Sequence, residues 1–115
     1  MNEIKYILEI ESFGKIFNFK TNLLSFTLPS SQTEKYFSVN RMVDKYSPLF
    51  YEYAHSGNNF PKMSLRAERR HNGNLRLLVI YSFTKVYIQE CQMQHDEEHF
   101  SFRFETILTG VSSMP

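Results

Sequence analysis

The sequence predicts a single, mainly β domain spanning residues 1–115: a β-barrel of two antiparallel sheets with one short flanking α-helix. Apolar and polar residues alternate over most of the chain, as they do in half-buried strands. Aromatic residues make up 16% of the chain, and they favour strands. Only residues 47–57 have helical spacing, so the chain lacks the strand–helix alternation of a parallel sheet. A length of 115 residues fits one domain.

Four strands are expected before the helix. The first runs from Ile4 to Ile10, where every second residue is apolar. A turn at Ser12-Phe13-Gly14 follows it, and Pro29 ends a later strand because proline has no N–H to donate to a neighbour. The other three strands are expected at residues 16–19, 24–28 and 36–40.

One helix is predicted after these strands. Ser47 is the expected N-cap, since its hydroxyl can accept a hydrogen bond from a free amide of the first turn. Pro48 then occupies the first helical position, and Gly57 supplies the left-handed residue that ends the helix. The helix is too short to persist alone, so its apolar face must pack on the strands. That face consists of Leu49, Phe50, Tyr53 and Ala54.

Strands resume after Pro61. They are expected at residues 63–67, 75–81, 86–93 and 100–107. Asn72-Gly73 predicts a tight hairpin turn between the first two. Residues 75–81 are apolar on both faces, which indicates a central strand. In the last strand one face points to the core, and it carries Phe100, Phe102 and Phe104.

Composition argues against several classes of function. The formal net charge is +1, which provides no strong field for nucleic acid or an anionic membrane. The single cysteine, Cys91, excludes an internal disulfide framework and suits a reducing compartment. No apolar run approaches the length of a membrane span, and no signal-peptide pattern opens the chain. We therefore expect synthesis in the cytoplasm and, if the protein leaves the cell, no cleaved signal peptide.

The residue clusters that could carry chemistry are weak. The segment HDEEH, residues 95–99, has two histidines but lies between strands, whereas a zinc peptidase needs this spacing on a helix. We interpret it as a polar turn, and Cys91 as a small buried apolar residue. A basic hairpin could bind phosphates, but Glu68 offsets its charge and we interpret it as a solvated strand end. It consists of Arg66, Arg69, Arg70 and Arg76, with His71. The prediction is no enzyme, no metal and no cofactor, with a small hydrolase using His95, His99 or Cys91 as the alternative.

The run FSVNRMVDKYSPLF, residues 37–50, resembles the hemolysin-coregulated protein family, the tube subunit of type VI secretion systems. That family carries a strand and then an Asp-Lys-x-Ser-Pro-Leu turn into its single helix. The resemblance covers residues 36–107. The opening third departs from the family, which usually has a longer opening with extended loops. The matching residues are Asp44, Lys45, Ser47, Pro48 and Leu49, then Gly57 at the helix end and Pro61 before the next strand.

The resemblance implies a structural role. Family members form a β-barrel with one flanking helix, and six copies make a ring. Stacked rings form the inner tube of a contractile injection device, which is fired with its spike and effectors inside a sheath. The expected partners are therefore further copies of the chain, spike and sheath components and small effectors, with no nucleic acid and no membrane insertion. The alternatives are a phage-like tail tube protein and a monomeric β-barrel binding module that uses the Asn72-Gly73 hairpin.

Overall fold

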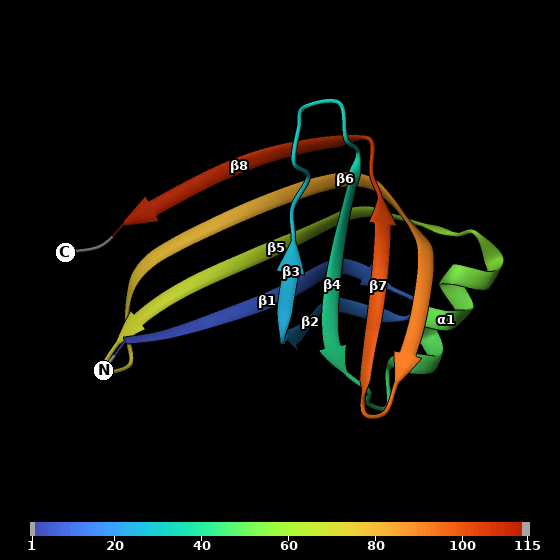
Figure 1. Ribbon diagram of the computed structural model, residues 1–115, viewed down its shortest axis with the longest axis horizontal. Coiled ribbons are helices and arrows are strands. Elements are labelled where there is room, and N and C mark those ends of the chain that lie inside the picture. Colours follow the sequence, from blue (N-terminus) through green and yellow to red (C-terminus); the bar gives the residue numbers. More distant parts are fainter. Residues whose placement is uncertain (1, 114–115) are drawn as a thin grey trace.

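The computed structural model describes residues 2–113 and shows a mainly β chain with one helix, as predicted (Figure 1). The elements are β1 (Asn2–Phe13), β2 (Ile16–Leu23), β3 (Ser25–Thr27), β4 (Tyr36–Met42), α1 (Ser47–Ser56), β5 (Asn59–His71), β6 (Asn74–Gln94), β7 (Glu97–Arg103) and β8 (Thr106–Ser113). Over residues 2–113, no helix has the length and apolar character needed to cross a membrane.

All strand pairs are antiparallel, and hydrogen bonds join the strands into one sheet. Its order is β2-β1-β5-β6-β7-β4-β3, and β8 pairs with β6 as a side branch. The two sheets expected from the sequence are thus two halves of one sheet that folds over itself. Figure 1 shows β3, β4 and β7 lying across the other strands, with α1 at one end. Among the described strands no ladder joins β2 to β3, so the barrel is not closed.

A bend in β6 produces this fold-over. The sequence predicts two strands at residues 75–81 and 86–93, but the structure has one strand of 21 residues. Lys85 within it adopts a left-handed backbone, with φ of 49°. Before this bend Thr84 pairs with Thr106 of β8, and after it Tyr87 pairs with Arg103 of β7. One strand therefore belongs to both halves, and the bend sends its second half over the core.

The final predicted strand, residues 100–107, is instead split between two strands. β7 ends at Arg103 and β8 begins at Thr106. Between them the Glu105 N–H donates to the Thr84 carbonyl, 2.9 Å away, which anchors the chain beside the bend in β6. The chain crosses from one half of the sheet to the other here.

The turns agree with the sequence-based predictions more closely than the strand boundaries do. Asn72 and Gly73 have φ of 51° and 83°, so the predicted hairpin turn is of the type that needs two left-handed residues. Gly57 ends α1 with φ of 75°, as predicted, and its N–H donates to the Tyr53 carbonyl. β5 begins at Asn59, two residues before Pro61. Pro61 is tolerated because β1 pairs with β5 only from Met63 onward.

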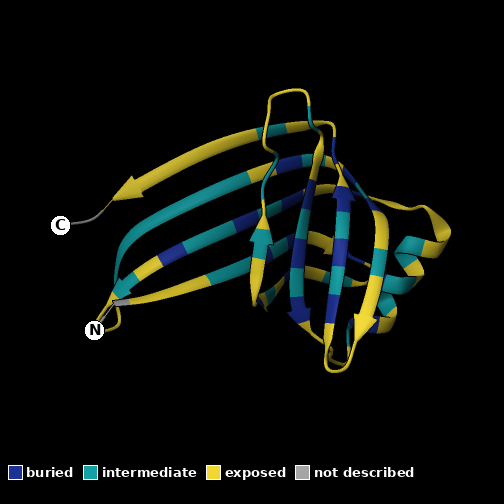
Figure 2. Cartoon of the chain, viewed as in Figure 1, coloured by how far each residue is buried: buried dark blue, intermediate teal, exposed yellow. Residues whose placement is uncertain are grey.

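The core lies where the two halves of the sheet and α1 meet. It is largely aromatic, and the predicted inward face of Phe100, Phe102 and Phe104 is confirmed, since all three are buried. Phe50 of α1 stacks on Phe100 with ring centroids 4.9 Å apart, which docks the helix on the sheet. Figure 2 shows most of the buried residues in this part, while the far ends of β1, β5, β6 and β8 are mostly half-buried or exposed; Glu68 of β5 is buried there.

Candidate functional site: a buried ion-pair network and an open sheet extension

Arg41 lies at the centre of a polar network inside the core. The side chain is fully buried, with 0% of the residue exposed, on the inward face of β4. Its guanidinium pairs with the carboxylates of Glu98 and Asp44. The same group also donates to the Thr21 hydroxyl of β2, at 3.2 Å from Nη2, and lies over the Phe50 ring at 4.9 Å. A buried charge is tolerated only when it is paired and hydrogen-bonded in this way.

Glu98 of β7 completes the network. Its Oε2 accepts hydrogen bonds from Arg41 and from the Ser47 hydroxyl, the latter at 3.0 Å. Its Oε1 accepts one from the Tyr51 hydroxyl, also at 3.0 Å. Burial, followed by the hydrogen bond to this carboxylate, raises the pKa of Tyr51 to about 12. The network therefore ties α1 to β2, β4 and β7, elements from both halves of the sheet.

The turn into α1 corrects the predicted N-cap. Ser47 is not the cap: Tyr46 occupies that position and makes no side-chain capping bond. The Ser47 hydroxyl instead makes two other hydrogen bonds: it accepts one from the Asp44 N–H at 3.0 Å and donates one to the Glu98 carboxylate. Asp44 Oδ1 accepts from the Tyr46 N–H at 2.9 Å, which closes the turn locally. The motif serine thus connects the turn to the core network.

The other motif residues shape the helix and its ends. Leu49 packs at Gly14, where an added Cβ would meet a Leu49 methyl at 3.3 Å. The Gly14 N–H donates to the Tyr53 hydroxyl at 2.9 Å, so the β1–β2 turn is held against α1. The remaining four motif positions are exposed: Lys45, Pro48, Gly57 and Pro61.

Sequence reasoning missed Arg41, Glu98, Tyr51 and Thr21. A signal for two of them was present. Arg41 continues the inward face of Phe37 and Val39 on β4. Glu98 likewise continues the inward face of Phe100 and Phe102 on β7. Two opposite charges on the inward faces of neighbouring strands predict a buried pair.

The HDEEH segment divides between a turn and a strand. His95 and Asp96 form the tight turn between β6 and β7, as predicted, and Glu98 points into the core. His99 faces outward, with Nδ1 2.8 Å from Asn40 Oδ1. Within residues 2–113 no group of three or more His, Cys, Asp or Glu side chains could hold a metal ion. Cys91 is partly buried and packs against the core.

Two of the four clustered arginines form ion pairs with glutamates on the sheet. Arg66 donates to Glu9 Oε1 at 2.7 Å and lies 3.4 Å from Glu68. Arg70 pairs with the same glutamate at 3.0 Å. The predicted compensation by Glu68 is confirmed for these two. Arg69 is exposed and lies on the opposite face, between Ile4 and Leu77.

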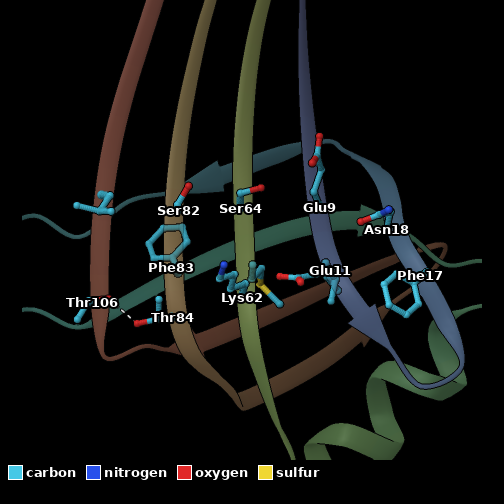
Figure 3. A pocket seen from close by; sticks show the side chains of 13 residues that line it. Glu9, Glu11, Phe17, Asn18, Lys62, Ser64, Ser82, Phe83, Thr84 and Thr106 are labelled. Carbon is cyan, nitrogen blue, oxygen red and sulfur yellow. Dashed lines mark hydrogen bonds between the residues drawn. The ribbon is translucent and has the colours of Figure 1, made fainter.

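A shallow groove of about 490 Å³ crosses the outer face of β8, β6, β5, β1 and β2 (Figure 3). Its floor is polar, with hydroxyl groups from Ser64, Ser82, Thr84 and Thr106. Phe17 and Leu108 flank it and are 78% and 75% exposed. The mixture of hydroxyl groups and exposed apolar side chains suits contact with another surface.

A more open surface lies beyond the core. There β1, β5, β6 and β8 extend past the other half of the sheet (Figure 1). Paired residues on their inner face include Tyr6, Ala67, Val79 and Val111. Phe26 of β3 packs on Tyr6, with ring centroids 5.2 Å apart, so the covered part of this face ends there. Val111 is 69% exposed and Ile4, on the same face, 59%. The exposed Val111 and Ile4, with the half-buried Ala67 and Val79, form an apolar surface at this end of the sheet. We call this four-stranded part the extension.

Comparison with known proteins identifies the family. The sequence pattern of the family described as "Type VI secretion system effector, Hcp" matches residues 17–109. The chain belongs to the Hcp family. This family is not a family of enzymes. Among curated proteins, no sequence matches the chain.

Solved Hcp structures share the fold at low sequence identity. Hcp1 from Salmonella typhimurium is 19% identical, with a TM-score of 0.70 over 96% of this chain and 94% of that one. The secreted protein Hcp3 from Pseudomonas aeruginosa is 12% identical, with a TM-score of 0.71 over 98% and 99%. A type VI secretion system effector from Yersinia pestis is 15% identical, with a TM-score of 0.66 over 95% and 99%. The chain thus spans nearly the whole length of these structures.

Proposed function

We propose that this Hcp protein is the structural subunit of the inner tube of a type VI secretion system. In this proposal six copies form a ring, and rings stack into a tube that carries small effectors and meets spike and sheath components. The subunit leaves the cell in the fired tube and needs no cleaved signal peptide. Its contribution is shape and contact, without catalysis.

The observation that carries the proposal is the uncovered inner face of the extension. Covering apolar surface is favourable by roughly 25 cal/mol per Å², so exposed side chains such as Val111 and Ile4 favour association. The surface continues directly from the core face, since Tyr6 follows Leu8 and Ile10 along β1. A neighbouring copy would therefore complete a core that one chain leaves unfinished.

The free edge of β8 supports the same conclusion. Residues 106–113 contain no charged residue and no proline, the usual devices that stop strands from pairing with other chains. β6 is the one strand of the described chain that pairs with β8, so the other edge of β8 remains open. A ring needs two different patches that meet with a rotation that closes, and an open edge beside an apolar face can serve as one of them.

Light scattering after size-exclusion chromatography, with negative-stain imaging of the same fractions, tests the proposal. A ring has several times the 13.7 kDa mass of one chain and gives annular particles. A phage-like tail tube protein would also give annular particles, and imaging with purified sheath or spike components then assigns the system. A mass of 13.7 kDa at high concentration, without annular particles, would contradict the tube and favour a monomeric binding module.

A further inference from the structure

Two surfaces near the opposite ends of β6 carry charges of opposite sign. β6 starts at the β5–β6 hairpin and ends at the β6–β7 turn on another side of the molecule (Figure 1). Arg69 of β5 lies near the first end, and Asp96 and Glu97 lie at the second. None of the three forms an ion pair among residues 3–113, and exposed apolar side chains lie beside each group.

The first of these surfaces, the basic patch, lies on the inner face of the extension. Arg69 is exposed there, and the residues directly opposite it on the neighbouring strands are Ile4 and Leu77. Apolar side chains thus flank this arginine, and no carboxylate within the described residues is within salt-bridge distance of it. The basic patch consists of Arg69, Ile4, Leu77, Val79 and Val111.

The second surface, the acidic patch, surrounds the β6–β7 turn. Asp96 and Glu97 are exposed, and neither forms an ion pair with another described residue. Glu97 pairs in register with Met42, and the Asp96 carbonyl accepts a hydrogen bond from the Val43 N–H at 2.8 Å. Met93 pairs with the inward-facing Glu98 and therefore lies on the other face of the sheet, outside this patch. The acidic patch consists of Asp96, Glu97, Met42 and Val43.

The two patches match in chemistry. Each has exposed aliphatic or methionine side chains around charge of one sign, and the signs are opposite. Charges at the edge of an apolar contact set its register and exclude wrong partners. Two different patches on one chain also satisfy the requirement of a heterologous, head-to-tail contact.

We propose that the basic patch of one copy binds the acidic patch of the next copy, with Arg69 against Asp96 and Glu97. This inference rests on the proposed function, since it assigns the joint through which that function assembles copies. The occupant of both patches is a second copy of this chain. The apolar residues supply the buried area, and the charges set the orientation.

Charge reversal in two separate proteins tests the joint. One protein carries Arg69→Glu, and the other carries Asp96→Lys with Glu97→Lys. Each alone brings like charges together, so the concentration at half assembly should rise at least about tenfold. Mixing the two at equal amounts should restore assembly, because every joint in an alternating arrangement again has opposite charges. Light scattering measures the mass, and added salt should weaken the wild-type assembly.

Matched controls separate the joint from a general charge effect. Lys15→Glu in the β1–β2 turn makes the same change of charge as Arg69→Glu, and Glu52→Lys on α1 makes the same change as either acidic substitution alone. Both sites are exposed and lie outside both patches, so these variants should leave assembly unchanged. Thermal unfolding should show that every variant folds. Two outcomes would overturn the proposed joint but not the proposed tube function. In the first, each charge-reversed protein assembles as well as the wild type; in the second, the mixture does not assemble. A wild type that remains at 13.7 kDa would overturn both proposals.

Discussion

The closed end of the molecule and the extension are built from the same strands but differ in what covers them. At the closed end α1 and the two halves of the sheet enclose the aromatic core and the Arg41–Glu98 pair. In the extension most residues of β1, β5, β6 and β8 are half-buried or exposed (Figure 2), and these include the inward-facing Ile4 and Val111. The comparison shows that these strands pair over their whole length, whether or not a core covers their inner face. We expect the closed end to determine the stability of one chain, and the extension to determine its association.

The largest effect on stability is expected at the buried ion pair. Glu98→Ala leaves the Arg41 guanidinium buried without its main partner, so the free energy of unfolding should fall by about 3–5 kcal/mol. Urea denaturation measures the change. The double variant Arg41→Met, Glu98→Leu is the control, and it should lose less than either single change because no charge remains buried. Equal losses in Glu98→Ala and the double variant would show that packing, and not the unpaired charge, dominates.

The aromatic core should respond almost as strongly. Phe102 is fully buried, and Phe102→Ala should lower the free energy of unfolding by about 3–5 kcal/mol through lost burial and a cavity. Chemical denaturation again provides the measurement. Unchanged stability would mean that the inward face of β7 has been assigned to the wrong side.

A smaller loss is expected at the motif serine. Ser47→Ala removes a hydrogen bond to the Glu98 carboxylate and leaves the Asp44 N–H without its acceptor, so we expect a loss of about 1–3 kcal/mol. The exposed Ser56→Ala, at the last position of α1, is the matched control and should cost much less. Ser47→Ala should cost less in a protein that already carries the Arg41→Met, Glu98→Leu pair, because only the hydrogen bond from the Asp44 N–H is then lost. A full loss in that background would contradict the role of the network.

Alkaline pH should weaken the closed end through Tyr51. The pKa of Tyr51 is raised from its ordinary value of 10.0 to about 12, so the unfolded chain releases this proton first. This contribution to stability is complete below pH 10 and is lost as the pH rises from 10 toward 12. The measurement is the free energy of unfolding against pH for the wild type and for Tyr51→Phe. The variant should show a shallower decline over this window, and identical slopes would contradict the assignment.

The smallest effect on stability is expected in the extension. Val111→Ser replaces an exposed side chain, so the free energy of unfolding should change by less than about 0.5 kcal/mol. Assembly, followed by light scattering, should nevertheless weaken, since the same side chain lies on the proposed contact face. The comparison of the two regions fails if Val111→Ser destabilises the single chain as much as Phe102→Ala.

Local signals in the sequence predicted the local structure well. Asn72-Gly73, Gly57 and the alternation of Phe100, Phe102 and Phe104 each depend on one residue type or a period of two, and each is confirmed. The apolar residues of α1 were also predicted, because the helical spacing is independent of the partner strand. The apolar residues on both faces of residues 75–81 predicted a central strand, and this segment pairs with strands on both sides.

The failures concern how distant segments meet. Ser82 to Lys85 looks like a break between strands, but Lys85 bends a single strand whose two halves have different neighbours. Ser47 has the right residue type for a cap, and only the position of Glu98 across the fold decides that its hydroxyl is used elsewhere. The open face of the extension was likewise invisible, since the alternation of β1 is the same where it is covered and where it is not.

Hydrogen exchange at dilute and at assembling concentrations tests the central claim most directly. The claim is that a neighbouring copy covers the extension while the closed end is complete in one chain. The amides of β8, residues 106–113, should exchange rapidly in the dilute protein and become protected on assembly, whereas those of β4 and β7 should change little. If β8 exchanges equally fast at both concentrations while the mass rises, copies meet through another surface and the account is contradicted.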